Sequence, residues 1–314
     1  MTVTAEQRLE RAELPARPPR VSERARHERR LGWMLAAPAM VVMLFVTAYP
    51  MLNALYLSLF SYRLTDPAGR RFVGLSNYLV VLGDGLFWSV VGTTAIITVV
   101  TVAVELVIGF AFAMVMHRIL IARGPVRTSI ILPYGIITVV SAFAWKYAFA
   151  LDSGFVNTWL NLGDFNWFGQ RWSSLLVICV AEIWKTTPII SLLLLAGLSQ
   201  VPDVLQEAAK VDGATWWQRV WRVTIPNMKA AIMVALLFRT LDAWRIFDTI
   251  ATMTQGAEGT ESLSFLTYRQ NITRLSLGMG GALSVLLFLS VLLIAVVIFK
   301  SFRIDLSSVR GDRR

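Results

Sequence analysis

Long apolar runs that could each cross a lipid bilayer constrain the fold of this chain more than any other feature. A helix rises about 1.5 Å per residue, so about 20 apolar residues span the hydrocarbon core. Five runs reach that length with no more than two charged residues each, and a sixth is weaker because it holds five. The six runs are Leu31–Phe60, Leu86–Met116, Thr128–Leu151, Trp172–Ser199, Met228–Met253 and Leu277–Phe299.

The composition places the chain among polytopic membrane proteins. Hydrophobic residues make up 56% of it, and the runs predict an all-α membrane protein because a helix satisfies its own backbone hydrogen bonds in lipid. The single Cys179 and the two histidines, far apart in sequence, exclude a disulfide framework and make a metal site unexpected. The net charge of +10 does not indicate nucleic acid, because the basic residues cluster beside apolar runs.

The distribution of Lys and Arg predicts that all six runs cross the membrane. With six spans, the segments on the side of the two termini hold 20 Lys and Arg, against 6 on the other side. This bias places both termini in the cytoplasm. The chain is then expected to have a basic, mostly disordered cytoplasmic arm over residues 1–30, a six-span domain over 31–303 and a cytoplasmic tail over 304–314.

Residues 199–227, called here the helical loop, are patterned as two short amphipathic helices on the cytoplasmic side. Pro202 suits a first helical turn and Gly213 a helix stop. Thr215 and Gln218 have the spacing of a capping box that opens a second helix. The apolar residues of the first helix repeat at i, i+3, i+4, i+7 and i+8: Val201, Val204, Leu205, Ala208 and Ala209. A stiff, patterned loop of this kind indicates a docking site.

The helical loop resembles the EAA loop of ABC importer permeases. The resemblance rests on Glu207-Ala208-Ala209, Asp212-Gly213-Ala214 and Ile225-Pro226, with Val220, Val223 and Ile225 replacing other apolar residues of the family pattern. It implies that residues 202–226 fit a cleft on a separate ATPase. The residues implied to couple to that ATPase are Glu207, Ala208, Ala209, Val211, Asp212, Gly213 and Ala214.

A second segment narrows the resemblance to sugar importers of the maltose type. Residues 243–248, followed by Met253-Thr254-Gln255-Gly256, are similar to the end of this span in those permeases, although Gly256-Ala257-Glu258 replaces Gly-Gly-Pro. The resemblance implies a disaccharide such as trehalose as substrate. It also implies a second homologous permease, a dimer of ATP-binding subunits and an extracytoplasmic sugar-binding protein, in a bacterial cytoplasmic membrane.

The chain itself is not expected to be an enzyme or to bind a cofactor. It has no Gly-Lys pair and therefore no GxxxxGK[ST] phosphate loop, so ATP and Mg are expected on the partner ATPase. Membrane lipid is the other expected partner.

Charged and aromatic residues inside the runs are candidates for a hydrophilic pathway, because charges at membrane depth usually face a bundle interior or a water-filled cavity. Structural ion pairs are the alternative, and for Glu182 with Lys185, spaced i, i+3, the ion pair is the favoured interpretation. The pathway candidates are Asp242, Trp244, Arg245, Asp248, Lys146, Trp145, Trp184 and Glu105.

Two other classes of protein remain as alternatives. An ion-coupled secondary transporter would act without an ATPase and would leave the helical loop unexplained; no inverted repeat is evident in the sequence. A membrane-embedded enzyme would need a nucleophile motif or a His/Asp/Glu cluster within the spans, and neither is found.

Overall fold

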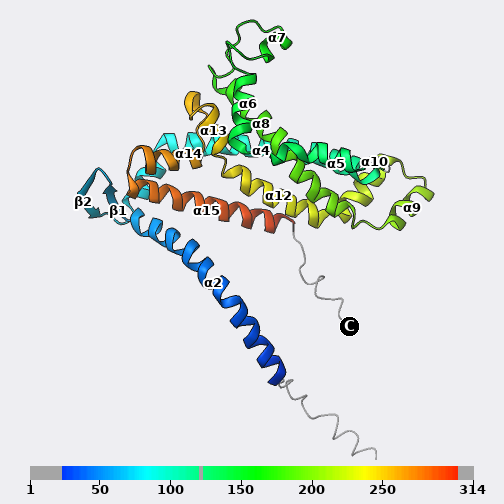
Figure 1. Cartoon of the computed structure of the whole chain (residues 1–314), viewed down its shortest axis with the longest axis horizontal. Helices are drawn as coiled ribbons and strands as arrows, with labels where there is room; N and C mark the ends of the chain where they lie inside the picture. The colour runs from blue at the N-terminus through cyan, green and yellow to red at the C-terminus, as the bar shows by residue number, and fades with distance from the viewer. Residues whose placement is uncertain (1–22, 120–122, 303–314) are drawn as a thin grey trace, which may run out of the picture. The chain divides into compact units, whose positions relative to one another are not determined.

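The structure is a computed structural model that describes residues 23–119 and 123–302. The chain divides into two units, residues 1–53 and 54–314, which are described separately. The tail predicted over 304–314 and most of the arm predicted over 1–30 lie outside the described residues. Helix α2 (Glu23–Ser58) begins inside the predicted arm, so residues 23–30 are helical rather than disordered. It provides the described part of the first unit (Figure 1).

The second unit opens with a β-hairpin that the sequence analysis did not predict. Strand β1 (Phe60–Arg63) pairs antiparallel with β2 (Asp66–Phe72), with Phe60 opposite Phe72. The guanidinium carbon of Arg70 lies 4.6 Å from the centre of the Phe60 ring and 5.2 Å from that of Tyr62. Cross-strand aromatic and cation–π contacts of this kind hold the two strands together. The prediction of an all-α chain was therefore wrong at residues 60–72.

Three of the predicted spans in the second unit are continuous or nearly continuous helices. They are α4 (Gly85–Arg118), α8 (Arg171–Leu198) and α15 (Leu277–Phe302). A short helix, α3 (Ser76–Gly83), precedes α4, and the side chain of Asp84 caps α4 by accepting the Leu86 N–H at 2.9 Å. With residues 30–58 of α2, the described residues contain four helices long and apolar enough to cross a membrane.

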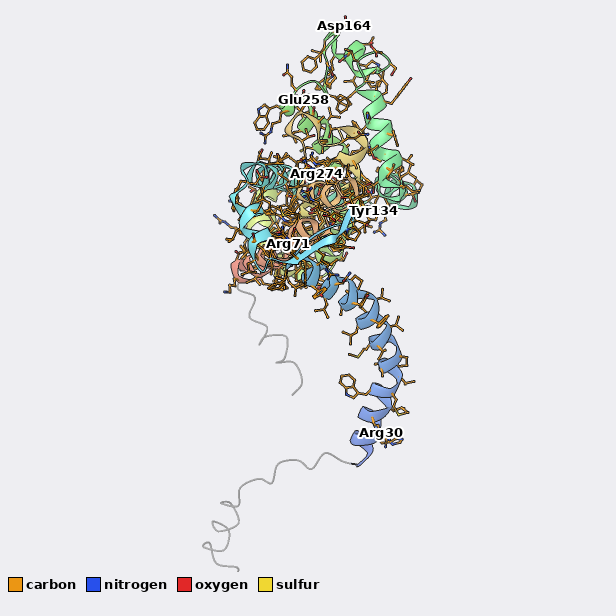
Figure 2. All side chains as sticks on the ribbon, turned by 90° about the vertical axis from the view of Figure 1, so that its left-hand side faces the viewer. Arg30, Arg71, Tyr134, Asp164, Glu258 and Arg274 are labelled. Carbon is orange, nitrogen blue, oxygen red and sulfur yellow. The ribbon has the colours of Figure 1, made fainter. Side chains whose placement is uncertain are left out.

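The third predicted span is bent by 90°. It consists of α5 (Arg123–Ile131), the 3₁₀ turn η1 (Leu132–Gly135) and α6 (Thr138–Ala148). After Pro133 and Gly135 the backbone of Ile136 is extended, so the helix cannot continue. In Figure 1, α6 and α7 (Val156–Leu160) project from the other helices, and Figure 2 shows Asp164 at the far end of this projection. If the bent pair counts as one span, the described residues contain five.

The fifth predicted span is also broken. Helix α12 (Lys229–Trp244) stops at Arg245, and α13 (Asp248–Met253) follows. The break leaves the buried carbonyl oxygen of Ile246 free of the helix, and it accepts a hydrogen bond from the Ser262 hydroxyl at 2.7 Å. The segment that joins α13 to α15 contains η3 (Ala257–Gly259), α14 (Leu263–Tyr268) and the π-helical turn η4 (Arg269–Thr273).

The core of the second unit forms where α4 packs along α8, the most extensive helix pair. Gly109 allows this approach, because a Cβ there would lie 2.9 Å from Cγ2 of Ile190 and 3.3 Å from the backbone nitrogen of Ser191. Gly278 and Gly281 allow α15 a similar approach, to the backbone of Phe60 and of residues 54–58. Small residues at such contacts are typical of membrane helices.

Candidate functional site

The first half of the helical loop is the amphipathic helix α9 (Asp203–Val211). Its end is closed by a Schellman motif: the N–H of Ala214 donates to the carbonyl of Ala209 at 2.9 Å, and that of Gly213 to Lys210 at 3.1 Å. The motif needs a left-handed residue, and Gly213 has a φ of 77°. The predicted helix stop at Gly213 is confirmed.

The second half comprises α10 (Trp216–Arg219), the π-helical turn η2 (Val220–Thr224) and α11 (Ile225–Asn227). The predicted capping box is confirmed: the Gln218 N–H donates to the Thr215 hydroxyl at 3.4 Å, and the Thr215 N–H donates to Oε1 of Gln218 at 2.7 Å. The Gln206 amide donates to the Thr224 hydroxyl at 2.9 Å and ties the two halves together. The loop is therefore a folded unit with fixed geometry.

Helix α9 leaves much of its apolar surface exposed. Val204 is 72% and Val211 87% exposed, and Leu205, Glu207 and Asp212 are exposed as well. Figure 1 shows α9 and α10 at the end of the second unit opposite the β-hairpin. Apolar side chains on a rigid, capped helix at one end of the second unit form a surface suited to a protein partner.

A buried ion cluster joins α4, α8 and α12. Arg239 is fully buried, and its Nε and Nη2 donate to the two carboxylate oxygens of Glu105 at 2.5 and 3.0 Å. Nη2 also donates to Glu182 at 3.3 Å, and Nη1 to Asp242 at 2.8 Å. The Thr186 hydroxyl donates to Glu105 at 2.7 Å. The predicted Glu182–Lys185 ion pair is wrong, because Glu182 turns to Arg239 instead.

A polar cavity of about 200 Å³ opens beside this cluster. Its wall carries both signs of charge and several hydroxyl groups, with Asp242, Arg245 and Asp248 all exposed on it. Lys185 contributes to the same wall and lies 5.5 Å from the centre of the Tyr134 ring. Donors and acceptors of both signs around one space suit a neutral, hydroxyl-rich solute.

Four of the eight pathway candidates lie at the ion cluster and the polar cavity. Glu105 and Asp242 both bind the Arg239 guanidinium, and Arg245 and Asp248 line the cavity. The other four lie elsewhere. Trp145 and Trp184 are in edge contact at 5.8 Å on a separate apolar groove between α4, α5 and α8. The remaining two are tied to the protein: Lys146 donates to the carbonyl of Thr252 at 3.1 Å, and Trp244 to the Ser290 hydroxyl at 2.8 Å.

Several residues of the cluster and cavity were not among the candidates from the sequence. Arg239 was visible as a charge at membrane depth, but nothing in the sequence showed that it would bind Glu105, 134 positions away. Thr249 donates to the other oxygen of Glu182, and Tyr134 lines the cavity from η1. Among the described residues, no group of three His, Cys, Asp or Glu side chains is placed to hold a metal ion.

Comparison with known proteins identifies the family. Residues 105–303 match the model of the binding-protein-dependent transport system inner membrane component. The chain is 48% identical over 275 residues to the trehalose transport system permease protein SugA of Mycobacterium tuberculosis, covering 88% of this chain and 89% of that one. It is 36% identical to the trehalose/maltose transport system permease protein MalF of Thermococcus litoralis, covering 87% and 94%.

The fold agrees with this assignment. A bacterial ABC transporter involved in the import of the acidic polysaccharide alginate contains a chain that superposes with a TM-score of 0.76 at 20% identity, covering 93% of this chain and 100% of that one. The chain therefore belongs to the family of inner membrane components of binding-protein-dependent transport systems, the permease subunits of ABC importers, and is a transport component rather than an enzyme.

Proposed function

We propose that this chain is one half of the translocation pathway of an ABC-type importer for a disaccharide such as trehalose. The observation that carries the proposal is the 48% identity to a trehalose permease over 88% of this chain. The polar cavity beside Asp242 supports it, because its mixed charges and hydroxyl groups suit a neutral sugar better than an ion.

Six spans with both termini in the cytoplasm complete the proposal. The bent pair α5–α6 counts as the third span, and α12 with α13 as the fifth. This count of six spans puts most Lys and Arg of the connecting segments on the cytoplasmic side. A second homologous permease, an ATPase dimer that carries ATP and Mg, and an extracytoplasmic sugar-binding protein would form the rest of the importer.

The helical loop is proposed to transmit the motion of the ATPase. Exposed Val204, Leu205 and Val211 would fill an apolar cleft on that subunit, while Glu207 and Asp212 would make polar contacts at its rim. The Schellman motif at Gly213 and the Gln206–Thr224 hydrogen bond support this role, because a rigid loop can carry displacement into α8 and α12.

Uptake by cells that carry the complete importer tests the substrate. Cells lacking this chain should lose uptake of labelled trehalose and regain it with the wild-type chain. Asp242→Asn, which keeps the size of the side chain, should lower uptake, and Phe288→Leu, on the exposed surface of α15, should not. Wild-type uptake of an unrelated amino acid but not of any disaccharide would refute the sugar assignment.

Co-purification tests the docking surface. Val211→Asp should release the ATPase, because it places a charge on an 87% exposed position of α9 without burying it in this chain. Ile272→Asp makes the same chemical change at an exposed position in η4 and should leave the ATPase bound. Transport by the purified chain alone, with no ATPase present, would instead favour an ion-coupled secondary transporter.

A further inference from the structure

A basic cavity of about 230 Å³ lies between the end of α4 and the helical loop. His117 and Arg118, in the last turn of α4, line one side, and Trp216 and Arg219 of α10 line the other. The guanidinium carbon of Arg118 lies 5.8 Å from the centre of the Trp216 ring. Asp203 is the acidic residue on this wall. Two guanidinium groups and an imidazole thus face a single carboxylate.

Two buried donors of this cavity lack an acceptor within the described part of the chain. They are Nε1 of Trp216 and Nε of Arg219. The indole N–H and the guanidinium can donate but not accept, and a buried donor left without a partner is unfavourable. The amide of Gln206 is already bound to Thr224. The groups left over are donors and cations, which is the composition of an anion site.

Two apolar grooves adjoin the basic cavity along α4. One, of about 440 Å³, includes Ala111 and Val115; the other, of about 420 Å³, includes Val107 and Trp217. Trp216 and Met114 line both grooves and also the basic cavity. The basic cavity therefore continues into apolar surface along α4, a helix that is long and apolar enough to span a membrane. An inorganic anion would use only the first part of this surface.

We propose that this surface is a binding site for an anionic phospholipid. The phosphate accepts hydrogen bonds from Arg118, Arg219 and Nε1 of Trp216, and the acyl chains lie along α4 in the two grooves. The inference rests on the proposed orientation, which places the helical loop at the cytoplasmic leaflet, where anionic lipids attract basic residues and Trp residues are enriched. The lipid then connects α4 to the loop that is proposed to dock the ATPase.

The test is lipid retention by the purified importer, measured by native mass spectrometry after exchange into an equal mixture of phosphatidylglycerol and phosphatidylcholine. Wild-type protein should retain phosphatidylglycerol preferentially. Arg219→Gln and Arg118→Gln should each lower that retention about fivefold, the equivalent of ~1 kcal/mol for one cation near the surface. Trp216→Phe, which keeps a ring but removes the N–H, should also lower it.

Arg222→Gln is the matched control, because Arg222 is an exposed cation in the same loop that does not line the cavity. Retention that is equal in Arg219→Gln and Arg222→Gln, or no preference between the two lipids in the wild type, overturns the proposal. Displacement of the lipid by millimolar inorganic phosphate also overturns it, in favour of a free-anion site. Retention is measured without sugar or ATP, so a failure of the proposed transport function would leave this result unaffected.

Discussion

Replacing Arg239 by Met should destabilise the bundle more than any other single loss of charge in the second unit. Arg239 makes four hydrogen bonds, of 2.5 to 3.3 Å, to three carboxylates. The side chain of Glu105 is 0% exposed and cannot recover solvation from water, and that of Glu182, 9% exposed at the edge of the polar cavity, can recover only a small part of it. After the substitution, the only hydrogen-bond donor left to Glu105 is the Thr186 hydroxyl, and the donor left to Glu182 is the Thr249 hydroxyl.

The expected loss is about 3–5 kcal/mol in the free energy of unfolding, the range measured when one partner of a buried ion pair is removed. Asp242 contributes little to this figure because its side chain is 54% exposed. Arg239→Lys should also be costly, because an ammonium group cannot donate to both Glu105 oxygens in the planar geometry of a guanidinium. Unfolding of the detergent-solubilised protein by SDS titration, followed by tryptophan fluorescence, measures each value.

Arg245→Met is the matched control, since Arg245 lies beyond the end of the same helix with an exposed side chain that donates to the carbonyl of Leu241. It should change stability by no more than about 0.5 kcal/mol. The double variant Glu105→Gln with Arg239→Met should be more stable than the sum of the two single losses predicts. A loss below about 1 kcal/mol for Arg239→Met would refute the view that the cluster holds α4, α8 and α12 together.

Three further outcomes follow from individual contacts. Gly213→Ala should weaken the end of α9 by about 1–2 kcal/mol, because φ is positive there, and Gly213→Asn by less; faster hydrogen exchange in α9 reports this, and unchanged exchange would contradict it. Gly109→Val should cost about 1–3 kcal/mol through overpacking against α8, whereas Gly92→Val, where a Cβ meets no neighbour within 4 Å, should cost less in the same unfolding assay. Burial raises the pKa of Glu261 despite the nearby Arg269. The folded state therefore binds more protons than the unfolded state, and the free energy of unfolding should fall as pH rises above the ordinary Glu value. Glu261→Gln should flatten this dependence of stability on pH, and an unchanged dependence would exclude Glu261 as its source.

The sequence predicted those features that depend on neighbouring residues. Uninterrupted apolar runs predicted the long helices α4, α8 and α15, because no other backbone arrangement of such a run is satisfied in lipid. The capping box at Thr215 and the helix stop at Gly213 were also predicted, since both are set within a few residues. The motif residues of the helical loop led to the family, which the comparisons confirm.

Only the tertiary structure decided how residues far apart in the sequence combine. The sequence made Glu105 a pathway candidate and favoured an ion pair of Glu182 with Lys185, but packing of α4 against α8 and α12 brought both carboxylates to the Arg239 guanidinium. The 90° bend between α5 and α6 could not be read from hydropathy, which averages over the break. Local pattern determined the long uninterrupted helices and the helix ends of the helical loop. The pairing of buried charges depended on helix packing, because a charge in a low-dielectric interior needs a partner that only the fold can supply.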